Sequence, residues 1–337
     1  MTATLRAVFA RLSLALAASV PLLLMGAGAV LAHGQEIAAP SFPGLLLEWT
    51  LDPLPFLGVV VAAVAYLWAE RHTNAAHAGT RVPGHRRWLF LAGLAVVLVA
   101  LVSPIDRYEG ELFSVHMVQH MLLELVAAPL IVLAAPITLA LRAASPGVRR
   151  GILAVLHSRI LRWLAFPITT WILFAGVNWG WHFSTSLYDL ALENDLVHYV
   201  EHATMLAAGL LFWWPAISPD PMPWRMPHPV RILYLFLAMP QMSFLGVALL
   251  SAEAPLYAHY VTNELTWGPA PLADQQLGGA LMWVMGDMVF LAAMIGIVGA
   301  WMRFEAIRTR RLDARLDEED RQREAAERAT EGALREP

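Results

Sequence analysis

Residues 113–136 read FSVHMVQHMLLELVAAPLIVLAAP, and this stretch decides the fold class because it is almost wholly apolar over the width of a bilayer. About 20 consecutive apolar residues suffice for a helix to cross the hydrocarbon core. Pro129 and Pro136 lie inside the stretch, where neighbouring helices of a bundle can satisfy the carbonyls that a proline frees. We therefore predict a kinked membrane-spanning helix over 113–141 with two histidines near its start.

The composition of the whole chain agrees with a membrane protein. The 337 residues are 58% hydrophobic and 15% charged, against roughly 45–50% and 25% for an average soluble domain. The chain has no cysteine, which excludes disulfides, thiolate chemistry and cysteine-ligated metals. A soft metal ion would therefore need histidine or methionine ligands.

Six further apolar stretches complete the predicted fold. We expect an all-α polytopic membrane bundle of seven transmembrane helices, with spans at 54–69, 88–103, 113–141, 163–182, 196–215, 230–250 and 276–302. The seven-helix domain covers 33–302, and residues 303–337 form a charged tail that we expect to be a solvated, fraying helix on the cytoplasmic side.

The first 32 residues resemble a secretory signal. Arg6 and Arg11 precede a long apolar stretch, and small residues lie directly before His33. This order predicts a signal peptide over 1–32 that is cleaved before His33. The apolar stretch is long for such a signal, so an uncleaved anchor helix is the alternative.

The arginines indicate how the bundle is oriented. Alternate connections, at 70–87, 142–162 and 216–231, carry most of the arginines between the spans, whereas 33–53, 183–195 and 251–275 carry none. Basic connections remain in the cytoplasm. We therefore expect a bacterial inner-membrane protein with its mature N-terminus outside and its C-terminus in the cytoplasm.

Two histidine pairs enter the membrane from the same predicted side. His116 and His120 begin one span, and His198 and His202 begin another. Residues four apart share one face of a helix, so each pair can direct two imidazoles to one point. Interfacial histidines that only bond neighbouring backbone are the structural alternative, but two pairs at one depth favour a metal site near the outer face.

Other polar groups fall at a similar depth. His182 is a further candidate metal ligand at the outer end of its span, and Asn178 lies one turn below it. Glu124 lies one turn below His120, where a carboxylate can orient a metal-bound imidazole. Asp287 lies halfway through the last span. Several methionines could offer thioethers to Cu(I), although core filling is their commoner role; they are residues 117, 121, 205, 242, 282, 285 and 288.

Three other functions use the same residues. A copper transporter would need the same ligands. A single haem could lie between the two histidine pairs, but pairs one turn apart are too close to hold two haems stacked through the membrane. The string HYVEH also matches the inverted zinc-protease motif, in which Glu201 would act as the base. That motif is short, and it leaves His116 and His120 without a role.

Three motifs together resemble one known family. FSVHMVQHMLLELVAAPLIVLAAP, HYVEHATMLAAGLLFWWPAI and DQQLGGALMWVMGDMVFL resemble, in this order and spacing, the CtaG family of cytochrome c oxidase assembly factors, the seven-span type associated with caa-type oxidases. The resemblance covers about 45–302. It implies matching family positions at His116, His120, His198, Glu201, His202, Asp274, Gln275 and Gln276. Glu124 belongs to no family pattern, so its expected role rests on the local spacing alone.

The resemblance implies a non-enzymatic factor that supports maturation of a copper-containing oxidase. We therefore expect copper as the metal, with His116, His120, His182, His198 and His202 as its ligands. We expect the metal ligands to be oriented by a surrounding layer of polar side chains, namely Glu124, Asn178, Glu201 and Asp274. The implied partners are haem–copper oxidase subunits, a periplasmic copper chaperone and membrane lipids, and nucleic acid is not among them.

Overall fold

The fold is known from a computed structural model that describes residues 39–41, 49–50, 52–77, 79–262 and 265–334. The regular secondary structure of these residues is helical throughout. The predicted signal peptide over 1–32 lies outside them. The helices are α3 (Pro53–Ala76), α4 (Gly84–Val102), α5 (Pro104–Tyr108), α6 (Phe113–Met121), η1 (Leu122–Ala127), α7 (Ala128–Leu133), α8 (Pro136–Ala143), α9 (Pro146–Leu156), α10 (Arg159–Leu164), α11 (Pro167–Phe183), α12 (Thr185–Glu193), α13 (Asp195–Ile217), α14 (His228–Leu250), α15 (Ala258–Thr262) and α16 (Pro271–Leu334).

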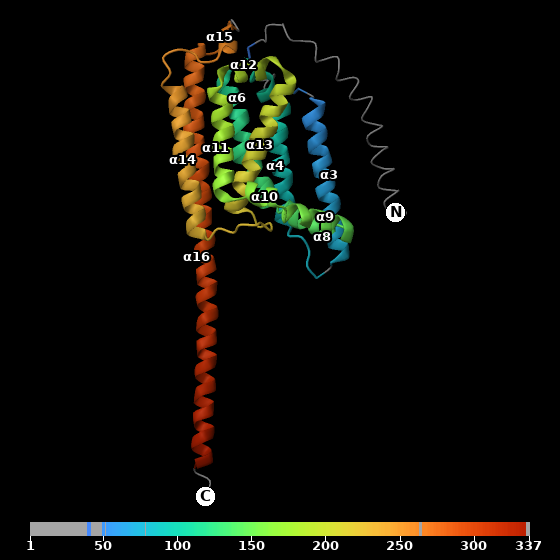
Figure 1. Cartoon of the computed structure of the whole chain (residues 1–337), viewed down its shortest axis with the longest axis vertical. Helices are drawn as coiled ribbons and strands as arrows, with labels where there is room; N and C mark the ends of the chain where they lie inside the picture. Colours follow the sequence, from blue (N-terminus) through green and yellow to red (C-terminus); the bar gives the residue numbers. More distant parts are fainter. Residues whose placement is uncertain (1–38, 42–48, 51, 78, 263–264, 335–337) are drawn as a thin grey trace, which may run out of the picture.

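Several of these helices can cross a membrane. Within the described residues, five segments are long and apolar enough, namely Pro53–Ala76, Gly84–Tyr108, Phe113–Ala143, His228–Leu250 and Pro271–Arg323. The predicted spans at 163–182 and 196–215 correspond to α11 and α13, which pack against each other within the bundle (Figure 1). The described residues therefore form an all-helical bundle with several candidate membrane spans, as expected of a membrane protein.

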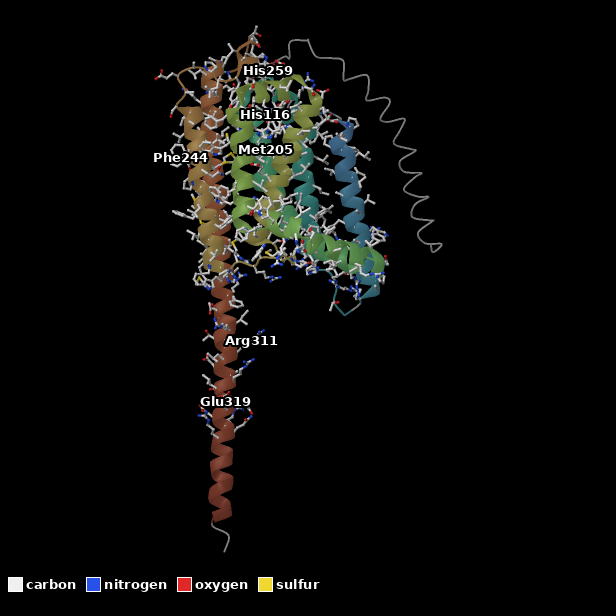
Figure 2. All side chains as sticks on the ribbon, in the orientation of Figure 1. His116, Met205, Phe244, His259, Arg311 and Glu319 are labelled. Atoms are coloured by element: carbon white, nitrogen blue, oxygen red, sulfur yellow. The ribbon has the colours of Figure 1, made fainter. Side chains whose placement is uncertain are left out.

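The bundle has two distinct ends. Figure 1 shows α12 and α15 at one end and α8, α9 and α10 at the other, with α16 continuing past that second end as a projecting helix. Arg311 and Glu319 lie on the projection in Figure 2. Its side chains from Ile307 to Arg323 are exposed, including the apolar side chains of Ile307 and Leu312. The arginine-bearing connections thus lie at the end from which the tail leaves.

The helix that begins at Phe113 is irregular. α6 passes into the π-helical turn η1, and α7 then carries Pro129 in its first turn. The predicted kink at Pro136 is a complete break, because α7 ends at Leu133 and Ala135 adopts φ +56° before α8 begins. The α-helical region is disfavoured for a residue that precedes proline, and Ala135 adopts the left-handed conformation instead.

Distant residues satisfy the backbone groups that these irregularities free. Both carboxylate oxygens of Asp220 accept hydrogen bonds from the first turn of α8, at 3.0 Å from Ile137 N and 2.6 Å from Thr138 N. Tyr66 Oη donates to Ala134 O at 3.1 Å. Trp213 Nε1 donates to Glu124 O, in the π-turn, at 2.8 Å. The broken helix is therefore held by contacts from three other parts of the chain.

Close backbone contact joins the last two long helices. A Cβ added to Gly246 of α14 would lie 2.6 Å from Gly279 O of α16, and a Cβ added to Gly279 would lie 2.6 Å from Gly246 O. Real Cβ atoms do not approach an oxygen that closely. Small residues at helix crossings allow such contact inside membranes, so these two glycines set the packing distance between α14 and α16.

We predict that Asp220→Ala destabilises the fold without unfolding it. The substitution removes the acceptor for two backbone N–H groups in a side chain that is only 1% exposed. Loss of a helix cap costs about 0.5–2 kcal/mol. Thermal unfolding of the detergent-solubilised protein should show a lower Tm, with Asp313→Ala in the exposed tail as the control. Equal Tm values for the two variants would contradict this role of Asp220.

Candidate metal centre

The structure brings the two histidine pairs together near the end of the bundle that carries α12 and α15. His116 and His120 project from α6 towards His198 and His202 of α13, and Figure 2 shows His116 inside the bundle near this end. The ring centroid of His116 lies 5.6 Å from that of His198 and 5.8 Å from that of His202. The rings of His120 and His202 are 5.5 Å apart. Four imidazoles from two helices therefore share one volume.

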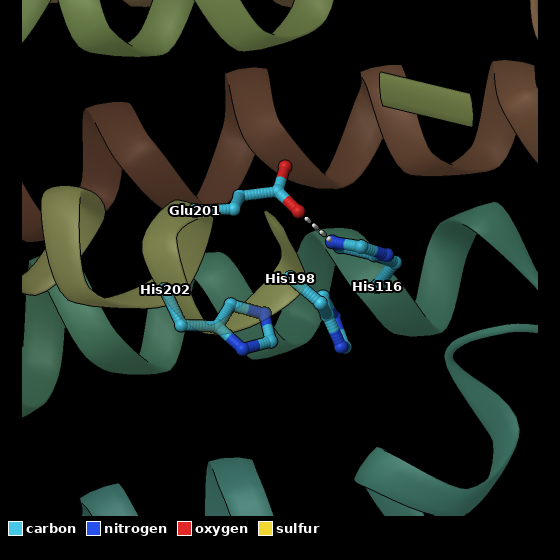
Figure 3. A group of neighbouring side chains, drawn as sticks. All are labelled: His116, His198, Glu201 and His202. Carbon is cyan, nitrogen blue, oxygen red and sulfur yellow. Dashed lines mark ion pairs between the residues drawn. The ribbon is translucent and has the colours of Figure 1, made fainter. Parts of the chain in front are cut away.

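Glu201 contributes a carboxylate to the same volume (Figure 3). Its Oε2 lies 3.7 Å from His116 Nε2, and its Oε1 lies 3.6 Å from His120 Nε2. The side chain is fully buried, and neither oxygen has a hydrogen-bond partner among the described residues. A buried carboxylate without partners is costly, so this oxygen pair is suited to bind a cation.

Glu109, which precedes α6, holds His116 in position. Its Oε2 lies 2.7 Å from His116 Nδ1 and 3.5 Å from His198 Nε2. Burial by itself would raise the pKa of Glu109, but His198 and His116 together lower that pKa well below its usual range. This contact leaves Nε2 of His116 facing Glu201 and His120.

The arrangement fits a metal ion. His116, His198, Glu201 and His202 each offer one ligand atom, and these atoms lie within 4.8 Å of one another. His120 Nε2 is a further neighbour, 2.8 Å from His116 Nε2. An imidazole nitrogen bound at about 2.0–2.1 Å in a tetrahedral site lies about 3.3 Å from the next ligand atom. The Glu201 oxygens lie 3.6–3.7 Å from His120 Nε2 and His116 Nε2, and these two nitrogens lie 2.8 Å apart, so the separations fall on both sides of that value.

Buried nitrogens without partners support the same conclusion. His198 Nε2 and His202 Nε2 are buried and have no hydrogen-bond partner within the described part of the chain, and the same holds for His120 Nδ1. Most buried polar side-chain atoms in proteins are hydrogen-bonded. Several exceptions within a single cluster indicate a site built for a ligand rather than for the stability of the fold.

His182 lies beside the cluster rather than within this group of four. Its ring is 5.7 Å from that of His120, measured between centroids. Its Nδ1 lies 2.7 Å from Asn178 O, and its Nε2 lies 3.2 Å from Met117 Sδ. The sequence predicted His182 as a fifth ligand. In the structure its ring lies next to His120 and Met117, beside the group formed by His116, His198, Glu201 and His202.

Glu124 contacts an amide instead of an imidazole. Asn178 Nδ2 lies 3.1 Å from Glu124 Oε1 and 3.0 Å from Oε2, so the two side chains form a buried pair. Glu124 belongs to the π-turn, which begins at Leu122. Its carboxylate therefore supports Asn178, and the expected contact with the imidazole of His120 is not among its hydrogen bonds.

The third family motif joins helices around the site. Asp274 accepts hydrogen bonds from Ser114 Oγ at 2.5 Å and from Ser114 N at 3.3 Å, next to the start of α6. Gln275 accepts from Leu256 N at 2.7 Å and donates to Leu249 O at 3.2 Å. Gln276 Nε2 donates to Ala252 O at 3.4 Å. These contacts fix α16 against α6 and the α14–α15 connection.

Sequence reasoning missed Glu109 and three tyrosines. Tyr260 Oη donates to Glu109 O at 2.9 Å and lies 3.4 Å from His116 Nδ1, while Tyr257 Oη donates to His182 O at 2.9 Å. Tyr188 Oη lies 3.3 Å from Tyr260 Oη. The only signal for Glu109 was its place seven residues before His116, and the tyrosines lie in connections that carry no recognisable pattern.

Comparison with known proteins identifies relatives of this chain. It is 33% identical over 279 residues to uncharacterized proteins of Mycobacterium bovis and Mycobacterium tuberculosis, and 30% identical to one of Mycobacterium leprae. Each alignment covers 80% of this chain and 42% of the relative, so the chain spans less than half the length of these curated relatives. No solved structure matches the chain.

The family of the chain follows from a separate match. Residues 64–304 match the family described as cytochrome c oxidase caa3 assembly factor. This range contains α6, α11 and α13, and with them all five histidines of the candidate metal centre. The match covers well over half of the sequence, and the chain therefore belongs to the cytochrome c oxidase caa3 assembly factor family.

Proposed function

We propose that this protein is a non-enzymatic assembly factor that supports copper insertion into a haem–copper oxidase, with copper as its cargo. The observation that carries the proposal is the buried cluster of His116, His198, Glu201 and His202 in a member of an oxidase assembly family. His120 adds a fifth donor beside it. Imidazole ligands suit copper, and the absence of cysteine leaves histidine, methionine and carboxylate as the donors.

Access to the cluster supports a delivery role. His198 is the most exposed of the five imidazoles, with 16% of its side chain accessible, whereas His116 is fully buried. Cargo would enter and leave by exchange at His198, and Glu109 links this ring to His116 through one carboxylate oxygen. The carboxylate of Glu109 thus joins His198, the ring proposed to exchange the ion, to the buried ring of His116.

The membrane topology is part of the same proposal. With α11 and α13 as spans beside the five segments identified by length and hydropathy, the bundle has seven transmembrane helices. The α12–α15 end faces outward and the arginine-bearing α8–α10 end faces the cytoplasm (Figure 1). The protein is then a bacterial inner-membrane protein with a cleaved signal over 1–32, and oxidase subunits and a periplasmic chaperone meet it at the outer end.

The other candidate functions fit the cluster less well. His116 Nε2 and His120 Nε2 lie 2.8 Å apart, and each has a Glu201 oxygen at 3.6–3.7 Å, so a carboxylate occupies space that a porphyrin bound to either nitrogen would need. A zinc hydrolase needs an open coordination position for water and substrate, whereas Glu201 and His116 have no exposed surface. A copper transporter would share the cluster and is separated from the assembly role by the deletion experiment below.

We predict that His116→Ala and His202→Ala each reduce copper affinity at least tenfold. Both rings belong to one cluster, so the double variant should bind little less copper than either single variant, because residues that act as a unit are not additive. Equilibrium dialysis with metal analysis of the purified protein provides the measurement. The control is His85→Ala, which replaces an exposed histidine in the first turn of α4, outside the cluster. Undiminished copper binding in the single variants would refute the shared site.

We predict that deletion of the gene lowers oxidase activity while transcription of the oxidase genes continues. The defect lies in maturation, so the oxidase isolated from the deletion strain should contain less copper per haem. Complementation with the wild-type gene should restore activity, and complementation with His202→Ala should not. If export of copper were the function, the deletion strain would instead accumulate copper and retain a fully metallated oxidase.

A further inference from the structure

A contact beside the main cluster has no ordinary hydrogen-bonding explanation. His182 Nδ1 lies 2.7 Å from the carbonyl oxygen of Asn178, which can only accept. The proton of a neutral His182 ring is therefore on Nδ1, and Nε2 carries a lone pair. That lone pair faces the thioether sulfur of Met117 at 3.2 Å, and a thioether sulfur is itself an acceptor. Two electron-pair donors thus face each other.

A second proton on the ring does not resolve this contact well. His182 is 1% exposed and Met117 is fully buried, so an imidazolium here would be a buried charge. Within the described part of the chain, the ring contacts Asn178, Met117 and the rings of His120 and Tyr188, and none of these groups is a carboxylate. A cation held by both lone pairs would satisfy the two groups together.

We propose that Met117 Sδ and His182 Nε2 form an inner half-site for a soft monovalent cation, Cu(I) in the cell, next to the outer cluster. Thioether ligands select soft ions, of which Cu(I) is the biological example. A nitrogen at about 2.0 Å and a sulfur at about 2.3 Å from one tetrahedral ion would lie about 3.5 Å apart. The observed 3.2 Å needs only a small outward movement of the flexible methionine side chain.

His120 connects the inner half-site with the outer cluster. Its ring centroid lies 5.7 Å from that of His182 and 4.3 Å from that of His116. An ion can therefore pass between the outer imidazole and carboxylate donors and the inner thioether and imidazole donors by exchange at this ring. The half-site deepens the copper function proposed for the cluster and rests on it for the identity of the ion.

The test uses the full-length protein in detergent, with Ag(I) as a redox-inert stand-in for Cu(I) and Zn(II) as the probe of the outer cluster. The variant is Met117→Leu, which conserves volume and removes only the sulfur. The matched control is Met205→Leu, a methionine that is equally buried but packs with Trp181 and Ala191. Ag(I) affinity is measured by competition with a chromophoric chelator, and X-ray absorption reports sulfur in the silver coordination shell.

We expect Met117→Leu to weaken Ag(I) binding at least tenfold, to remove the sulfur signal and to change Zn(II) affinity less than twofold. Met205→Leu should match the wild type in all three readouts. Ag(I) bound without sulfur in the wild type, or equal Ag(I) affinity in both variants, would overturn the inner half-site. If the wild type bound neither Zn(II) nor Cu(II) but still showed the silver–sulfur signal, the outer cluster would be refuted and the inner half-site supported.

Discussion

Glu201 is a carboxylate without exposed surface among imidazoles, and the arrangement of this end of the bundle depends on keeping it there. Each buried polar group left without a partner costs about 1–3 kcal/mol, and neither oxygen of Glu201 has one in the described part of the chain. The surrounding contacts, from Glu109 to His116 and from Asp274 to Ser114, fix α6 so that its rings face this carboxylate. The fold thus accepts a local loss of stability where a ligand can recover it.

The irregular path from α6 to α8 has a similar logic. A π-turn and a break before Pro136 free backbone groups that lipid could not satisfy, and Trp213, Tyr66 and Asp220 satisfy them from elsewhere in the chain. One consequence reaches the site, because the π-turn directs Glu124 to Asn178, whose carbonyl in turn fixes the His182 ring. The π-turn and the His182 imidazole are therefore linked through Asn178.

Hydropathy and helical spacing predicted the all-helical membrane fold and brought forward both histidine pairs, because these features depend on periodicity within single helices. Glu109, Tyr188 and Tyr260 were missed because their contacts with His116 or with one another arise only when short connections fold over the end of the bundle. Glu124 was expected to orient an imidazole, and its carboxylate contacts the Asn178 amide of another helix instead, which spacing within one helix could not show. Patterns within single helices therefore predicted the histidines of the candidate site, whereas the contacts that orient their rings depend on tertiary structure.

The chemistry of the donors suits the proposed role, in which the protein releases copper to the oxidase. Thiolate sites bind metal so strongly that folding itself can depend on the ion, with apparent binding energies of about 10–16 kcal/mol for structural zinc. A chain without cysteine offers neutral imidazoles, a thioether and one carboxylate pair, which bind copper less tightly. Among these donors, His198 is partly accessible, whereas His116 and Met117 are fully buried. Within the proposed function, such a series retains an ion through several exchangeable contacts, and no single contact is strong enough to prevent transfer to the oxidase.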